Sequence, residues 1–219
     1  MVRHSKAFVD QSSARIPGGV RKPLQQRSRA SLERVYQACN ELLQEQTFDA
    51  ITIAQISAKS AVTVGSIYQR FGSKDALLWD LYEHYLDNVH ERVNELGEEL
   101  VGASSRSRAS AVLELAVGLF RQHRGTVRSL LLRHQHSPGT VPAALSQRIE
   151  TITARITDLL VAGQATDEDR LDLEFRYSVA VAACRDHLLF RSFRALAGQS
   201  DDKAFIDRLA LIIFDQPKG

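Results

Sequence analysis

The amino-acid sequence predicts an all-α protein. Apolar residues recur at three- and four-residue spacing along almost the whole chain, which is the period of helices that bury one face. The residues that punctuate β-hairpins are scarce, with 12 Gly and 5 Pro in 219 residues. A chain of this length can form one large or two small domains with a hydrophobic core. We therefore expect a helical protein built in two parts.

The charges of the chain are unevenly distributed. Residues 1–74 carry 11 Lys and Arg against 5 Asp and Glu, whereas residues 75–219 carry 17 against 21. A basic front joined to a slightly acidic remainder is typical of a small DNA-binding domain attached to a second functional part. We divide the chain accordingly into a flexible basic arm, a DNA-binding domain and a larger helical domain, at residues 1–26, 27–75 and 76–219.

Several classes of protein are disfavoured by the sequence. It has no run of about 18 apolar residues and no apolar secretory leader. Cys39 and Cys184 lack metal-ligand spacing and fall on apolar helix faces, so we expect buried, reduced thiols. No nucleophile–base pair, phosphate-binding Gly loop or paired carboxylates occur at a catalytic spacing. We expect a cytoplasmic protein that is not an enzyme and has no cofactor, metal or membrane contact.

The first predicted helix extends from about Ser28 to Gln46, and Phe48 and Ile51 follow it as core contacts of a short loop. Its apolar positions share one face, as helical periodicity requires. They are Leu32, Val35, Tyr36, Cys39, Leu42 and Leu43.

Two short helices follow, joined by a tight turn. Thr52 begins the first of them, because a threonine with Gln55 three residues later is a capping-box pattern. The turn covers residues 59–62. Thr63 is then placed to cap the next helix, Val64–Arg70.

A long helix comes next. Gly72 ends the preceding helix, and Ser73 caps the long one, which runs from Lys74 to about Leu100. Asp75 in its first turn suits the helix dipole. An apolar stripe continues along it at helical spacing: Leu77, Leu81, Tyr85, Val89, Val93, Leu96 and Leu100.

The C-terminal part is also predicted to be helical. A Gly/Ser/Arg-rich break at 102–107 and a loop at 134–141 interrupt the apolar periodicity. Pro142, Thr166 and Ser200 mark the starts of later helices. The expected helices cover approximately residues 112–120, 127–131, 142–160, 166–196 and 200–214.

The helix at Val64–Arg70 has the properties of one that enters the major groove of DNA. Such a helix needs small or polar residues at its N-terminal end, which here reads Thr-Val-Gly-Ser from Thr63. Gly65 costs about 1 kcal/mol relative to alanine inside an ordinary helix, which indicates close approach of DNA. Ile67 and Phe71 point into the core and direct the intervening side chains outwards.

The outward side chains are candidate DNA contacts. Gln69 can read a base edge, whereas Tyr68 and Thr63 can reach phosphates. Lys74 offers a positive charge beside backbone N–H groups, and Arg70 adds a further cation. Thr52 is explained equally well as a helix cap. The predicted DNA-binding residues are Thr52, Thr63, Val64, Gly65, Ser66, Tyr68, Gln69, Arg70 and Lys74.

The segment from Leu32 to Trp79 resembles the N-terminal domain of the TetR family of transcriptional regulators. The family pattern is matched by Thr52, Ile56-Ser57, Ala61-Val62, Tyr68, Phe71, Gly72-Ser73, Lys74 and Leu77. Ser57 replaces the usual alanine, and Ala61 replaces the usual turn glycine, although alanine disfavours a left-handed conformation. The resemblance implies DNA contacts from Thr52, Thr63, Ser66, Tyr68, Gln69 and Lys74.

The resemblance also implies how the protein works as a whole. Members of the family are homodimers that bind palindromic double-stranded DNA, and their second domain encloses a small-molecule pocket. We therefore expect a repressor that an effector releases from its operator. The alternative is an architectural or cell-division protein with the same DNA-binding domain and no ligand.

The last two predicted helices carry more apolar residues than one core requires. Small residues at Ala180, Ala182 and Ala183 permit close helix approach, so a two-fold, four-helix interface fits this surplus. Burial within one protomer is the alternative. The predicted interface residues are Phe175, Val179, Ala183, Leu189, Phe193, Phe205, Leu209, Ile212 and Ile213.

The ligand-binding residues cannot be assigned from the sequence. Arginines recur at three- to five-residue spacing between Arg121 and Arg133, with His123, His134 and His136 nearby. A solvated basic face explains this pattern, and an anionic ligand or a metal is the alternative.

Overall fold

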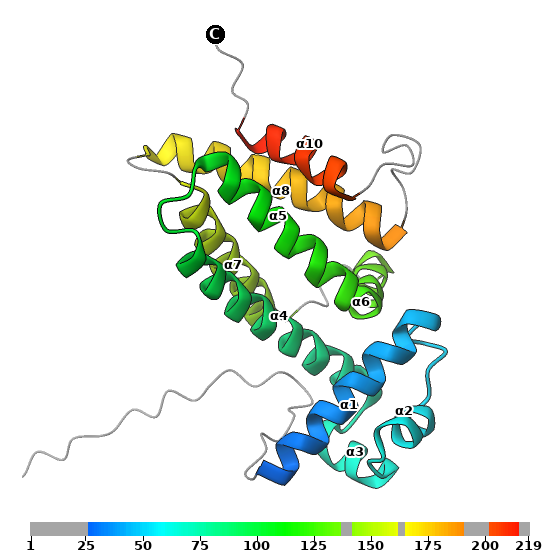
Figure 1. Ribbon diagram of the computed structural model, residues 1–219. Coiled ribbons are helices and arrows are strands. Elements are labelled where there is room, and N and C mark those ends of the chain that lie inside the picture. Colours follow the sequence, from blue (N-terminus) through cyan, green and yellow to red (C-terminus); the bar gives the residue numbers. More distant parts are fainter. Residues whose placement is uncertain (1–25, 137–141, 162–164, 191–201, 215–219) are drawn as a thin grey trace, which may run out of the picture.

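The computed structural model describes residues 26–136, 142–161, 165–190 and 202–214 (Figure 1). Every regular element within these residues is a helix, which confirms the all-α prediction. The helices are α1 (Gln26–Glu45), α2 (Ile53–Ser60), α3 (Val64–Phe71), α4 (Lys74–Glu99), α5 (Ser105–Gln122), α6 (Arg124–His136), α7 (Ala143–Leu160), α8 (Asp167–Phe190) and α10 (Asp202–Phe214).

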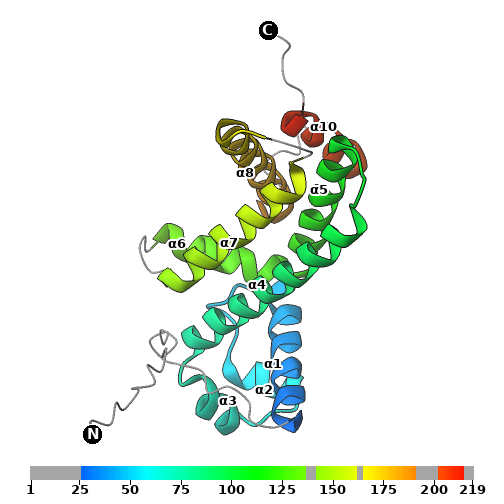
Figure 2. The ribbon, with the colours of Figure 1, turned by 90° about the vertical axis from the view of Figure 1, so that its left-hand side faces the viewer.

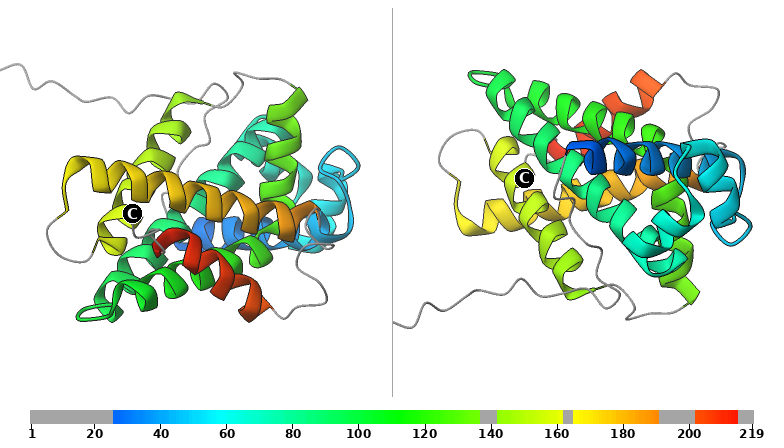
Figure 3. Two further views of the ribbon diagram at one scale, coloured as in Figure 1. Left: turned by 90° about the horizontal axis from the view of Figure 1, so that it is seen from above. Right: turned by 90° about the horizontal axis from the view of Figure 1, so that it is seen from below.

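The helices form a small N-terminal domain and a larger C-terminal one that share α4. Helices α1 to α3 lie at one end of the molecule, and α4 runs from them into the second domain (Figures 1 and 2). There α7 packs on α4, while α10 packs on α5 and α8. Helices α8 and α10 lie across the end of the molecule farthest from α3 (Figures 1 and 3).

Caps define the helices of the N-terminal domain as predicted. The Thr52 side chain accepts a hydrogen bond from the Gln55 amide at 3.2 Å, and the Thr52 amide donates to the Gln55 side chain at 2.7 Å. Thr63 and Ser73 accept equivalent bonds from Ser66 and Ala76. These bonds satisfy amides that have no partner within the helix, so each cap fixes where its helix begins.

The turn between α2 and α3 closes in the conformation that glycine would favour. Ala61 has φ 53° and ψ 33°, in the left-handed region, and is the one non-glycine residue of the described chain with positive φ. The Cβ atom makes this conformation cost about 1–2 kcal/mol. The alanine therefore leaves the geometry of the turn unchanged at a small cost in stability.

Two clusters of buried side chains form the core. The first joins α1, α2 and α3 to the start of α4 and continues along α4 as far as Leu81. The second begins with Tyr85 and fills the space between α4, α5, α7, α8 and α10. Trp79 and Tyr82 pack against both clusters. The N-terminal core thus extends past residue 75 into the middle of α4.

Some boundaries in the C-terminal domain differ from the predictions. Helix α5 already begins at Ser105, because the Ser104 side chain accepts a hydrogen bond from the Ser107 amide at 3.2 Å. His134 and His136 belong to α6 rather than to a loop. Thr166 does open α8, through a reciprocal pair of hydrogen bonds with Asp169. The basic arm, residues 137–141 and the predicted Ser200 cap lie outside the described residues.

The two cysteines have the predicted environment. Cys39 and Cys184 are both free and buried, and burial raises the pKa of each thiol to about 12. None of the described helices combines the length and the apolar character that a membrane crossing requires.

His123 is a buried polar side chain at the end of α5. It is 4% exposed, and its Nε2 atom has no hydrogen-bond partner among the described residues. Its ring lies against Tyr85 at a centroid distance of 5.1 Å. Burial lowers the pKa of His123 from 6.5 to about 4. The folded protein therefore holds this imidazole neutral at neutral pH.

This burial predicts an acid-sensitive contribution to stability. Between pH 6.5 and about 4 the unfolded chain binds a proton at His123 that the folded chain does not. The free energy of unfolding should therefore fall as the pH falls through this window, by up to about 3 kcal/mol. His123→Phe keeps a ring against Tyr85 and should lack this part of the pH dependence. Urea denaturation at pH 7 and pH 4.5 measures the difference, and equal pH dependence in both proteins would contradict the prediction.

Candidate nucleic-acid interface and internal cavity

Helix α3 presents a continuous outer face. Ile67 and Phe71 are each 1% exposed and anchor the helix on the first core. Tyr68 is 48% exposed, and Gln69 is exposed beside it. Thr63, Val64, Gly65 and Ser66 are exposed at the N-terminal end. The orientation predicted for α3 is therefore correct.

The N-terminal end of α3 is narrow and polar. The Thr63 and Ser66 hydroxyl oxygens lie 2.8 Å apart, in hydrogen-bond contact. A Cβ atom built on Gly65 would meet nothing within 4 Å. Packing within the protein therefore does not require a glycine here. The missing side chain instead leaves the backbone of the first turn open to an outside molecule.

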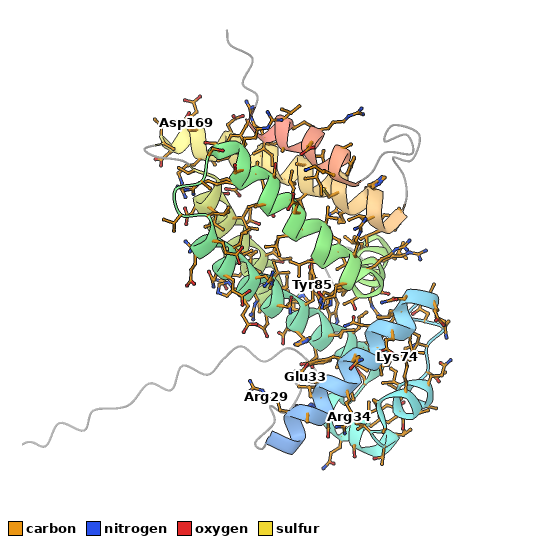
Figure 4. The ribbon with its side chains drawn as sticks, in the orientation of Figure 1. Arg29, Glu33, Arg34, Lys74, Tyr85 and Asp169 are labelled. Atoms are coloured by element: carbon orange, nitrogen blue, oxygen red, sulfur yellow. The ribbon has the colours of Figure 1, made fainter. Side chains whose placement is uncertain are left out.

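Lys74 has structural contacts that the sequence did not reveal. Its Nζ atom donates a hydrogen bond to the Asp49 carbonyl oxygen at 3.1 Å and lies 4.7 Å from the centroid of the Phe48 ring. These contacts tie the start of α4 to the loop that follows α1. Lys74 is labelled in Figure 4. A lysine has three N–H donors, so this bond leaves donors for a phosphate.

Arg70 has an environment that the sequence did not reveal. Its Nε and one terminal nitrogen are buried, and its guanidinium lies 6.0 Å from the Phe71 ring. The positive charge is close enough to Tyr36 and Asp80 to oppose the rise that burial causes in the pKa of both groups. Arg70 is partly exposed and its charge lies near Tyr36 of α1 and Asp80 of α4, so its role as a DNA contact stays a prediction.

Thr52 is the remaining predicted DNA contact. Thr52 is exposed, and its side chain is engaged in the cap of α2, which was the alternative explanation.

Arg133, in the basic stretch of α6, pairs with Asp75 at 2.6 Å. No cluster of three or more His, Cys, Asp and Glu side chains suitable for a metal occurs within the described residues.

Comparison with known proteins identifies the family of the N-terminal domain. Residues 35–81 match the sequence pattern of a family described as bacterial regulatory proteins, tetR family. The N-terminal domain belongs to the TetR family. The matched segment ends at Leu81, which is also the last residue of α4 in the first core. It contains the whole of α2 and α3.

A curated relative of the TetR-type domain is an uncharacterized HTH-type transcriptional regulator, YerO, of Bacillus subtilis (strain 168). It is 28% identical over 103 residues, which cover 45% of this chain and 34% of that protein. The match thus spans about a third of the relative's length.

Two crystal structures share the fold over most of the chain. A TetR transcriptional regulator from Rhodococcus sp. RHA1 has a TM-score of 0.52 and 17% identity, covering 88% of this chain and 100% of that one. A TetR-family transcriptional regulator from Streptomyces coelicolor has a TM-score of 0.53 and 24% identity, covering 84% and 92%. At these identities the likeness establishes the fold, with a TetR-type domain followed by a helical domain.

The domain that follows the TetR-type domain contains a cavity of about 530 Å³. Helices α4 to α8 supply its walls, which are mainly aliphatic and aromatic. Tyr85 of α4 is one of the wall residues, further along α4 than Lys74 (Figure 4). The volume lies in the range of pockets that hold small molecules. The residues of this cavity could not be assigned from the sequence because its walls come from five helices.

Helix α6 connects the cavity with the TetR-type domain. Val127, Leu130 and Leu131 line the cavity. At the start of the same helix, the Thr126 hydroxyl donates a hydrogen bond to the Asn40 side chain of α1 at 2.7 Å. A Cβ atom on Gly125 would lie 2.3 Å from the Leu43 Cβ atom, so α6 and α1 approach as closely as a glycine permits.

The structure divides the predicted dimer-interface residues. Phe175, Val179 and Ile212 are 68%, 43% and 47% exposed, as an interface requires. The structure corrects three others, because Leu189, Leu209 and Ile213 are at most 5% exposed within the single chain. Ala183 and Phe205 are half-buried, and Phe193 lies outside the described residues. Leu171 and Leu211 are further exposed apolar residues of the same helices.

Proposed function

We propose that the protein is a homodimeric transcriptional repressor that binds a palindromic DNA operator and is released from it by a small-molecule effector. The observation that carries the proposal is the outer face of α3, which combines an open N-terminal turn with exposed polar side chains in a TetR-type domain. A helix with this face fits the major groove of DNA.

The DNA contacts follow from the chemistry of α3 and its neighbours. Gln69 is placed to read a base edge, because an amide can donate and accept hydrogen bonds at once. Tyr68, Thr63 and Ser66 are placed to contact phosphates. Lys74 supplies a positive charge, and Thr52, Val64 and Gly65 complete the contact surface.

Dimerisation would place two such faces on one duplex. The exposed apolar side chains of α8 and α10, including Phe175, Val179 and Ile212, support an interface at the end of the molecule away from α3. A two-fold dimer reads two half-sites about one helical turn of DNA apart, which is why the operator should be a palindrome.

Effector release has a physical route through the shared helices. An occupant of the cavity contacts α4 and α6 directly. Helix α4 begins at Lys74 in the TetR-type domain, and α6 touches α1 through Gly125 and Thr126. A shift of either helix therefore changes how α3 is presented to DNA. An effector that binds the shifted form more tightly weakens operator binding.

Selection of bound fragments from a randomised double-stranded DNA library tests the proposal. The purified protein should enrich a palindrome. Gln69→Ala should still enrich it but relax one position in each half-site, with a loss of about 1–3 kcal/mol of discrimination. Gln147→Ala, at an exposed glutamine of α7, is the matched control and should behave as the parent protein. Lys74 is unsuitable for this test because its substitution also removes the contact with Asp49.

The outcome separates the two functions under consideration. Enrichment of no sequence by the parent protein would contradict the proposal. Enrichment of a palindrome whose binding no small molecule weakens would favour the architectural or cell-division alternative.

A further inference from the structure

The cavity beside the TetR-type domain is lined mainly by apolar side chains. Among the described residues that line it, Arg185 of α8 has the one charged side chain, and no Asp or Glu is present. Most of the remaining lining is aliphatic or aromatic, with Trp79 and Phe120 among the rings. Such a cavity accepts an apolar body and repels a positive charge.

Arg185 has one buried nitrogen, Nε, without a hydrogen-bond partner in the described part of the chain. Its charge lies close enough to Tyr82 to oppose the rise that burial causes in the pKa of that phenol. A buried donor without an acceptor costs free energy, and one belonging to a cation costs more. An occupant that supplies an anionic acceptor would remove this cost.

Three phenol side chains, Tyr82, Tyr85 and Tyr177, line the same cavity. The rings of Tyr82 and Tyr85 are stacked at a centroid distance of 5.7 Å. Tyr85 is also electrostatically coupled to Tyr177, and burial raises the pKa of all three phenols. They are therefore neutral O–H groups, and Tyr82, whose pKa responds to the charge of Arg185, can donate a hydrogen bond to an oxyanion bound there.

We propose that the cavity binds a lipophilic monoanion, with its apolar body among the aliphatic and aromatic side chains and its acid group on Arg185 and the Tyr82 hydroxyl. This inference rests on the proposed function in taking the cavity as the effector site. The acid group would bridge α8, which carries Arg185, and α4, which carries Tyr82. Binding would thus join the helix of the proposed dimer interface to the helix that starts in the TetR-type domain.

Trp79 provides the measurement, because it is the only tryptophan of the chain and lines the cavity. Its fluorescence is titrated with two matched series that differ only in the head group. One consists of dodecanoate, dodecan-1-ol and dodecylamine, and the other of 4-phenylbutyrate, 4-phenylbutan-1-ol and 4-phenylbutylamine. In at least one series the acid should bind about tenfold or more tightly than the alcohol, and the amine should bind most weakly.

Variants assign the preference to Arg185. Arg185→Met should bring the acid and the alcohol to similar affinities, whereas Arg185→Lys should keep a preference for the acid. Arg170→Met on the same helix removes a cation that pairs with Asp158 outside the cavity, and should leave the preference unchanged. Circular dichroism checks that each variant is folded. If Arg185→Met is not folded, the affinities of the acid, the alcohol and the amine are compared in the parent protein and in Arg185→Lys.

The ligand titrations can contradict the inference while the proposed DNA-binding function stands. Acids that bind no better than alcohols in both series, or that do not bind at all, would overturn it, as would an acid preference that survives in folded Arg185→Met. DNA binding is measured separately on the same samples. Acids that bind at Trp79 through Arg185 but leave operator binding unchanged would support the inference and contradict effector release.

Discussion

Gly125→Ala is expected to destabilise the protein by about 1–3 kcal/mol and to disturb the contact between α6 and α1. The added Cβ atom would lie 2.3 Å from the Leu43 Cβ atom and 2.4 Å from its carbonyl oxygen, and the backbone cannot yield as a flexible side chain can. Overpacking of this kind typically has an energetic cost of that size. Because α6 lines the cavity, the displaced helix should also weaken the effect of any cavity ligand on DNA binding.

Gly118→Ala is the matched control for this substitution. Gly118 is an exposed glycine within α5, and a Cβ atom there would meet nothing within 4 Å. This change should stabilise the protein by up to about 1 kcal/mol, because alanine is the better helix former. Thermal or urea unfolding of the two variants measures the contrast. Equal stabilities for Gly125→Ala and the parent protein would show that α6 and α1 are not held at this distance.

Gly65→Glu is expected to abolish operator binding while the fold stays intact. The glutamate would stand in the first turn of α3, where a negative charge interacts favourably with the helix dipole, and it has free space. The same charge would face the phosphates of the DNA. Like charges forced together cost several kcal/mol, which corresponds to a loss of affinity of about a hundredfold or more.

The comparison for this prediction is Gly118→Glu, which makes the same chemical change on α5, outside the TetR-type domain. Fluorescence anisotropy with a labelled operator should show unchanged binding for Gly118→Glu and a loss for Gly65→Glu. Unfolding measurements should find both variants folded. Operator binding by Gly65→Glu at the affinity of the parent protein would remove the N-terminal turn of α3 from the contact surface.

The N-terminal domain could be predicted from the sequence because its signals are local. Each cap lies within three residues of its partner, as Thr52 and Gln55 do, so the pattern and the structure coincide. Arg70 shows where this reasoning ends. Its sequence neighbours place it on the outer half of α3, but its direction is set by Tyr36 and Asp80, which lie on other helices. No local pattern contains that information.

The C-terminal domain was harder to predict because α8 is apolar on more than one face. Phe175 and Val179 are exposed, whereas Ala180 and Cys184 are fully buried a short step around the same helix. Spacing identifies both faces, but which one is inner depends on where α5 and α10 pack. The residues that line the cavity could not be assigned for a similar reason, because they come together only through the relative placement of several helices.

The sharing of side chains between the two cores limits the modularity of the DNA-binding part. Leu130 of α6 belongs to the first core, although it lies far beyond that core in the sequence, and Trp79 and Tyr82 belong to the surroundings of both. A fragment cut after residue 75 would lose Leu77, Leu78 and Leu81 as well. The TetR-type domain therefore cannot be separated from α4 and α6 without exposing part of its core. Grafting it onto another partner would require a replacement for the apolar surface that α4 and α6 now supply.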